Sequence, residues 1–113
     1  MITLSANLPV EQREGERLGT LTRLLATERM HNRVPLFARV LLKAGSRIPL
    51  HQHLGTFEAF YILGGKGRVI DNGNEATVSA GDVVFTDDGE SHAIENPGPD
   101  DLEYVALVVL TTP

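Results

Sequence analysis

The chain has 113 residues, a length that suits one domain and leaves little room for two. It contains no cysteine, so it has no disulfide and no thiolate, and any metal must be held by nitrogen and oxygen. The formal net charge of −5 argues against nucleic acids and anionic membranes as partners, because both reward a basic patch.

The first thirty residues are the least clear part of the chain. Residues 1–10 lack the basic start and the apolar run of a signal peptide. Four leucines between residues 18 and 25 have helical spacing, yet Gly15 and Gly19 each weaken a helix by roughly 1 kcal/mol relative to alanine. We expect a loop followed by a strand near residues 20–25, and we assign residues 1–30 to an N-terminal arm of a single domain, residues 1–113.

From residue 36 onward, short runs rich in β-branched, aromatic and leucine residues alternate with turns rich in glycine, asparagine and aspartate. The Asn72-Gly73 pair, for example, suits the type I′ turn of a hairpin. The pattern predicts an all-β sandwich or barrel over residues 31–113. The expected strands lie near residues 36–43, 47–53, 57–63, 67–71, 74–79, 82–85, 91–96 and 102–110.

The last expected strand is apolar on both faces from Val105 onward. A strand with one face in water should alternate between apolar and polar residues. Both faces are therefore covered, either by a second sheet and a terminal segment or by another subunit, and we predict a homodimer. The run 105–110 is far too short to cross a bilayer. With no signal peptide, the default location is cytoplasmic.

Two of the four histidines form a His-x-His pair, His51 and His53. Successive side chains on a strand point to opposite faces, so these two histidines share one face. The other face of the same strand is expected to carry Ile48, Leu50 and Leu54.

An acidic residue, Glu58, interrupts the apolar run of residues 57–63. Its odd spacing from His53 would put it on the opposite face of a continuous strand, so the chain must bend or bulge for the two to meet. Gly55 permits such a bend. With Glu58 inward, Phe60 and Ile62 also face inward. A buried carboxylate is costly without a partner, so Glu58 should meet a cation or hydrogen-bond donors.

His92 lies on the expected strand 91–96, with Ile94 and Asn96 on its face. Three imidazoles and one carboxylate suit a manganese, iron, nickel, copper, cobalt or zinc ion. They leave one or two positions open in a five- or six-coordinate ion, as a catalytic or ligand-binding metal requires. On spacing alone, a strand histidine is more often an ordinary core or surface residue. His31, in a polar stretch, is expected on the surface.

The spacing of these residues resembles the two sequence motifs of the cupin superfamily. The first motif, G-x5-H-x-H-x3,4-E-x6-G, is complete and comprises Gly45, His51, His53, Glu58 and Gly65. The second motif, G-x5-P-x-G-x2-H-x3-N, is matched by Gly81, Gly89, His92 and Asn96, with Asp87 where proline is usual. That departure affects a turn and not a ligand.

The resemblance implies an antiparallel jelly-roll barrel, or double-stranded β-helix, of the small single-domain bacterial cupin 2 type. It implies that one divalent transition-metal ion is held by His51, His53, Glu58 and His92. It also implies that the protein is a dimer, as cupins frequently are, often with N-terminal strands exchanged or packed across the interface.

The cupin fold hosts many functions, so only the site can indicate which one applies. Phe60 and Ile62 are expected to make a substrate pocket apolar near the metal. On the strand 36–43, one alternative turns Arg39 inward, where its guanidinium would bind a substrate carboxylate. The other alternative turns Ala38 and Val40 inward and leaves Arg39 as a solvated outer charge. Two further arginines beside turns, at positions 47 and 68, are expected on the surface.

Two functions follow from these expectations. The first is a metalloenzyme acting on a small oxygen-rich acid, with decarboxylase-like or dioxygenase-like chemistry and no catalytic residue yet assigned. Decarboxylation would need a mobile acidic residue near the metal. Asp87, Asp88 and Glu90 lie in a turn that could reach it, but we expect them to cap that turn. The alternative is a non-catalytic module that binds a sugar or another metabolite.

Overall fold

The computed structural model describes residues 1–112. This part of the chain forms ten β-strands and three short 3₁₀ helices, Ser5–Asn7, Gly15–Arg17 and Thr27–Met30. The strands are β1 (Val10–Arg13), β2 (Gly19–Arg23), β3 (Leu36–Leu42), β4 (Arg47–Gln52), β5 (Thr56–Gly64), β6 (Lys66–Asp71), β7 (Asn74–Ser79), β8 (Val83–Thr86), β9 (Ser91–Glu95) and β10 (Leu102–Leu110). None of the helices in residues 1–112 is long and apolar enough to span a membrane.

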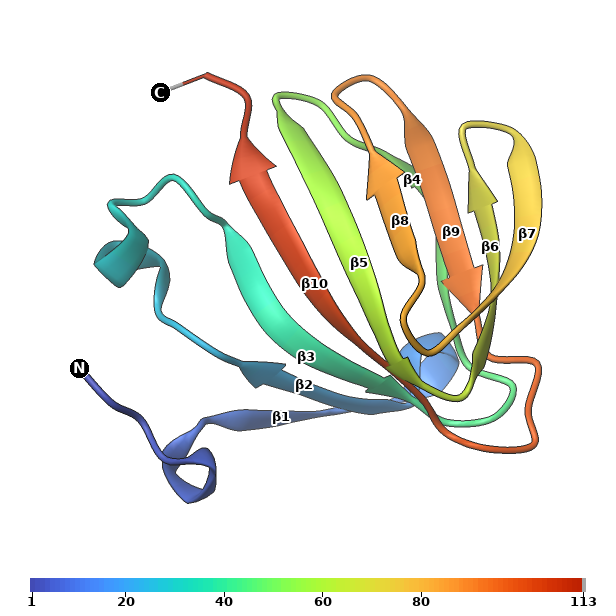
Figure 1. Cartoon of the computed structure of the whole chain (residues 1–113), viewed down its shortest axis with the longest axis horizontal. Helices are drawn as coiled ribbons and strands as arrows, with labels where there is room; N and C mark the ends of the chain where they lie inside the picture. Colours follow the sequence, from blue (N-terminus) through green and yellow to red (C-terminus); the bar gives the residue numbers. More distant parts are fainter. Residues whose placement is uncertain (113) are drawn as a thin grey trace.

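The strands form two sheets whose paired neighbours are antiparallel (Figure 1). The six-stranded sheet has the order β1-β2-β3-β10-β5-β8, and the four-stranded sheet has the order β4-β9-β6-β7. Val40, Phe60 and Tyr104 from the first sheet form one core with Ile48 and Ile94 from the second. The expected all-β jelly-roll barrel is confirmed.

Strand β10 lies in the middle of the six-stranded sheet and pairs with β3 on one side and β5 on the other. Its inward residues Tyr104 and Ala106 are buried in the core, whereas Val105 and Leu107 on its other face are only partly buried. The outer face is therefore apolar without being fully covered by this chain.

The expected strands from residue 36 onward are all present, with ends that differ by at most one residue. The N-terminal region differs more. The expected loop contains a strand, β1, which pairs with β2 and extends the six-stranded sheet by one edge strand. The alternation in β1 is weak because three of its four residues are exposed, and this explains why the sequence pattern does not reveal it.

Candidate metal centre

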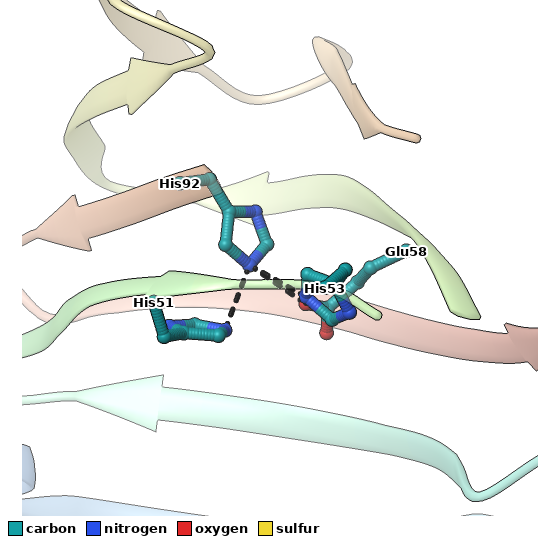
Figure 2. Close-up of side chains that lie close together, drawn as sticks. All are labelled: His51, His53, Glu58 and His92. Atoms are coloured by element: carbon teal, nitrogen blue, oxygen red, sulfur yellow. Dashed lines mark hydrogen bonds and ion pairs between the residues drawn. The ribbon is translucent and has the colours of Figure 1, made fainter. Parts of the chain in front are cut away.

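Three strands bring four side chains that could ligate a metal to one place between the sheets. His51 lies on β4, His53 directly follows that strand, Glu58 lies on β5 and His92 lies on β9. One donor atom from each residue lies within 4.8 Å of all the others. Figure 2 shows the three imidazoles and the carboxylate turned toward one another. The structure therefore brings together the four residues that the sequence motifs single out.

A register shift in β4 sets the direction of the first histidine. The pairing with β9 is irregular between Ile48 and His51, so the strict alternation of side chains is broken across Pro49. As a result Ile48 is buried in the core and lines the same pocket as His51, whereas Leu50 is exposed. The expectation that Ile48 and Leu50 share the face opposite the histidines is wrong for Ile48. The reason is that proline cannot donate the hydrogen bond that a regular ladder needs.

The bend expected between His53 and Glu58 is present at Gly55, whose φ of 77° suits glycine. The Gly55 N–H donates a hydrogen bond of 2.8 Å to the Asp88 carboxylate, which fixes the bend against the turn between β8 and β9. Beyond the bend, Glu58, Phe60 and Ile62 all face inward as expected.

The donor atoms lie close together, and three of the four side chains are almost completely buried. The Nε2 atom of His92 lies 3.0 Å from His51 Nε2 and 3.1 Å from His53 Nε2. The Glu58 Oε1 atom lies 2.9 Å from the Nε2 atoms of both His53 and His92. The side chains of His92, Glu58 and His53 are only 1%, 8% and 10% exposed.

Outer hydrogen bonds determine which ring nitrogen of two histidines carries the proton. His51 Nδ1 lies 2.8 Å from the Pro49 carbonyl oxygen, which can only accept, so Nδ1 is the donor. Thr86 donates its hydroxyl proton to Asp71, so its oxygen accepts from His92 Nδ1 at 2.7 Å. In the tautomers that these bonds select, the Nε2 atoms carry lone pairs that point into the cluster. His53 Nδ1 has a similar contact of 2.8 Å with the Thr56 hydroxyl.

This arrangement could hold a metal cation at its centre. Two unprotonated Nε2 atoms at 3.0 Å, and a carboxylate oxygen at 2.9 Å from one of them, repel one another unless a positive charge lies between them. Burial also lowers the pKa of His53, against the opposing effect of the Glu58 carboxylate, and this favours the neutral form that coordinates metals. The nitrogen and oxygen donors, with their outer hydrogen bonds, fit a divalent transition-metal ion.

A pocket of about 250 Å³ opens beside the cluster. Phe60 lines it and stacks on the His92 ring, with 5.0 Å between ring centroids and 18° between the planes. Ile62 faces inward but is fully buried in the core and does not line the pocket. Buried Tyr104 lines the pocket beside Phe60, and burial and the nearby Glu58 raise the pKa of its hydroxyl.

Arg39 is not part of this pocket. On β3 the inward residues are Ala38 and Val40, so the alternative that turned Arg39 toward a substrate is wrong. Its guanidinium lies on the outer face of the sheet, 3.4 Å from the Glu103 carboxylate. The arginines that do line the pocket are Arg13 and Arg17, which the sequence patterns did not indicate. Their position depends on the pairing of β1 with β2, and no motif marks it.

The acidic turn between β8 and β9 is engaged in local hydrogen bonds. The Asp88 carboxylate accepts from Gly55 N–H and from the Thr111 hydroxyl, and Glu90 accepts from the Asp87 N–H. Proline at position 87 could not make that last bond, so the departure from the motif is accommodated within the turn. Among residues 1–112, Glu58 is the one carboxylate that lines the pocket.

Arg47 and Arg68 lie on the surface, as expected, and line a separate hollow of about 400 Å³ on the outer face of the four-stranded sheet. Both are paired with carboxylates, Arg47 with Glu16 and Arg68 with Glu75 and Glu95. This hollow is larger than the pocket beside the histidines, but its lining residues within 1–112 include no cluster of metal ligands.

Comparison with known proteins agrees with this geometry. The cupin domain family matches residues 38–109. An oxalate-binding protein of Thermotoga maritima is 46% identical over 97% of this chain and 94% of its own length. A crystal structure from Thermotoga maritima, described as a predicted oxalate decarboxylase, has 46% identity and a TM-score of 0.88 and covers 97% of this chain and 99% of its own. The cupin domain of Schizosaccharomyces pombe Cnp3, at 21% identity, shares the fold with a TM-score of 0.73 over 95% of this chain and 72% of its own. The family match and the identity to the Thermotoga maritima protein show that this chain belongs to the cupin family.

Proposed function

We propose that this protein binds one divalent transition-metal ion through His51, His53, Glu58 and His92 and binds a small oxygen-rich acid of the oxalate class at that metal. The observation that carries the proposal is the convergence of four donor atoms beside a small, mostly apolar pocket. When bound, the metal supplies a Lewis acid with positions left open for the oxygens of an acid. The oxalate-binding protein that is 46% identical to this chain supports the choice of ligand.

The remaining residues of the pocket shape it for a small ligand. A volume of about 250 Å³ lies below the usual range for drug-sized ligands and accommodates an acid of a few heavy atoms. Phe60 forms an apolar wall next to His92, and such walls exclude water and strengthen electrostatic interactions inside the site.

Turnover of the bound acid, by a decarboxylase-like or dioxygenase-like reaction, is the second candidate. The relative described as a predicted oxalate decarboxylase favours it. Binding remains the primary proposal because the carboxylates of the β8–β9 turn are held in hydrogen bonds, which leaves no free acid in the described lining to move a proton. The remaining alternative is a ligand without charge, such as a sugar. Such a ligand would gain less from a divalent metal ion than an acid would, because it carries no negative charge.

Calorimetry with the metal-loaded protein tests the proposal. Oxalate should bind with one-to-one stoichiometry to the loaded protein and not to the metal-free protein. A neutral sugar should bind to neither. Incubation with oxalate, followed by measurement of formate and carbon dioxide, separates binding from turnover. Equal oxalate binding with and without metal would contradict the proposal.

We also propose a homodimer formed by the outer face of the six-stranded sheet. Cross-strand pairs join Phe37 to Leu107, Leu107 to Ala59 and Ala59 to Phe85 in one apolar row across four strands. A parallel row contains Tyr61, which is 50% exposed. Contiguous apolar surface of this kind marks an interaction site.

A further inference from the structure

The N-terminal hairpin places two arginines in the lining of the pocket beside the four ligand candidates. Arg13 is the last residue of β1, and Arg17 ends the 3₁₀ helix Gly15–Arg17 that connects β1 to β2. Both line the pocket that also contains His51, His53 and Glu58. Arg17 is exposed and Arg13 is half-buried, whereas Glu58 lies deep in the pocket. The two arginines and three of the four ligand candidates therefore line one small cavity, with Arg17 on its exposed side.

The segment that carries Arg17 is fixed to the barrel. The Glu16 carboxylate lies 2.9 Å from the guanidinium of Arg47 on β4, the strand that carries His51. On the other side, the Lys43 N–H donates to the Leu18 carbonyl at 2.9 Å. Gly19 approaches β3 so closely that a Cβ atom there would lie 1.8 Å from the Leu41 carbonyl oxygen. These contacts hold the hairpin over the pocket from both sides.

The charges of the two arginines are uncompensated. Within residues 1–112, neither Arg13 nor Arg17 forms an ion pair with a carboxylate. By contrast Arg39, Arg47 and Arg68 on the outer surfaces all form ion pairs. Two unpaired arginines in the lining of a cavity that would also hold a divalent ion give it an excess of positive charge, because Glu58 is the one acidic side chain in the described lining. Such a cavity favours an anion with more than one negative charge.

We propose that Arg13 and Arg17 bind the end of the acid that points away from the metal and make the site selective for doubly charged over singly charged acids. The inference rests on the proposed function, because it concerns the ligand of the same site. A guanidinium donates two parallel hydrogen bonds to a carboxylate, so an acid with a second carboxylate gains a partner that a hydroxy acid lacks.

The electrostatics of a neighbouring group support this placement. The pKa of buried Tyr104 is raised by burial and by Glu58, and the positive charges of Arg13 and Arg17 act on it in the opposite direction. The fields of both guanidiniums therefore reach the interior of the pocket as well as the solvent outside it.

The test compares oxalate with glycolate, which has the same two-carbon frame and one charge fewer. Arg13→Gln and Arg17→Gln remove one guanidinium each, and Arg29→Gln removes an exposed guanidinium from the distant 3₁₀ helix Thr27–Met30 as a matched control. Calorimetry on each metal-loaded variant gives both dissociation constants, and elemental analysis gives the metal content. We expect unchanged metal content in all three. The dissociation constant for oxalate should rise about tenfold or more for each pocket variant and that for glycolate much less. The control variant Arg29→Gln should keep the wild-type dissociation constants for both oxalate and glycolate.

The outcomes separate this inference from the proposed function. If the wild type binds oxalate in a metal-dependent way and both pocket variants bind it equally well, the proposed function stands and the role of Arg13 and Arg17 is wrong. Equal losses for oxalate and glycolate would also overturn the selectivity. If the metal-loaded wild type binds no oxalate, the proposed function itself fails, and this inference fails with it.

Discussion

Thr86 and His92 share a buried hydrogen bond of 2.7 Å that determines which nitrogen of the imidazole faces the metal site. The Thr86 hydroxyl donates a hydrogen bond to Asp71. The hydrogen-bonded chain Asp71–Thr86–His92, which joins β6, β8 and β9, therefore holds the imidazole in one tautomer. Partners of this kind orient ligating histidines and raise their basicity. Thr86 is completely buried, so its hydroxyl needs these two hydrogen-bond partners to offset the loss of water.

Replacing Thr86 by valine should therefore weaken metal binding without removing a ligand. Valine has nearly the same shape but cannot accept the proton of His92 Nδ1, so the ring loses its fixed tautomer. We expect about a 10- to 100-fold loss of metal affinity, measured by competition with a chromophoric chelator. Thr22→Val, which changes another buried threonine on β2, is the matched control and should retain the wild-type affinity. Similar losses of metal affinity in both variants would show that replacing any buried threonine disturbs the packing of the barrel, and would contradict the specific role of Thr86.

The Asp88 carboxylate should stabilise the fold in a pH-dependent way. Its pKa lies below the ordinary value of 3.8, first because of the Gly55 N–H and then because of the Thr111 hydroxyl. A carboxyl with a lowered folded pKa contributes stability that is complete above 3.8 and is lost as the pH falls through the folded value. We expect Asp88→Asn to lower the melting temperature of the metal-free protein at neutral pH, with a difference that shrinks in acid.

The control for this prediction is Asp100→Asn, an exposed carboxylate in the turn before β10. It should change the melting temperature little at any pH. A difference between wild type and Asp88→Asn that is constant from neutral to acid pH would contradict the role of the ionised carboxylate at the Gly55 bend.

Asn96 should be important for stability and not for chemistry. Its buried amide donates to the carbonyls of Leu42 and Asp100, and its oxygen accepts from the Gly98 N–H, each at 2.8 Å. Asn96→Ala leaves these backbone groups without partners, so the free energy of unfolding in urea should fall by about 1–3 kcal/mol or more. Metal stoichiometry should be unchanged. Asn7→Ala, at an exposed position, should leave the free energy of unfolding as it is. An Asn96 variant as stable as wild type would refute the assignment.

The outer face of the six-stranded sheet should hold two copies together. Light scattering at micromolar concentration should give the mass of a dimer. Phe85→Asp introduces a charge at a side chain that is 51% exposed, so it should yield folded monomers. Thr77→Asp, an exposed position on β7 of the other sheet, should leave the dimer intact. A monomer mass for the wild type would contradict the prediction.

Local patterns in the sequence were sufficient to predict the strands after residue 36. They also predicted that the side chains of Glu58, Phe60 and Ile62 face inward. These features depend on the period of two along a strand and on one glycine bend, and both can be seen in adjacent residues. The four ligand candidates were identified by the spacing of two motifs and were brought together by the fold.

The features that the sequence did not reveal depend on contacts between distant segments. Ile48 faces inward because the pairing of β4 with β9 slips at Pro49, and alternation alone cannot show this. Arg13 and Arg17 line the pocket because β1 pairs with β2 and Glu16 pairs with Arg47, which lies 31 positions away. In the sequence, Thr86 is indistinguishable from an ordinary strand residue. Its role depends on Asp71 of β6, which lies beside it only in the folded chain.

The measurement that tests the central claim most directly is elemental analysis of the protein purified without a histidine tag or chelator, beside His51→Ala and His92→Ala. We predict near one equivalent of manganese, iron, nickel, copper, cobalt or zinc per chain in the wild type. Both variants should lose most of this metal while keeping the circular-dichroism spectrum of the folded barrel. Equal metal content in the wild type and both variants would contradict the account. So would a wild type without metal whose melting temperature does not rise when any of these ions is added.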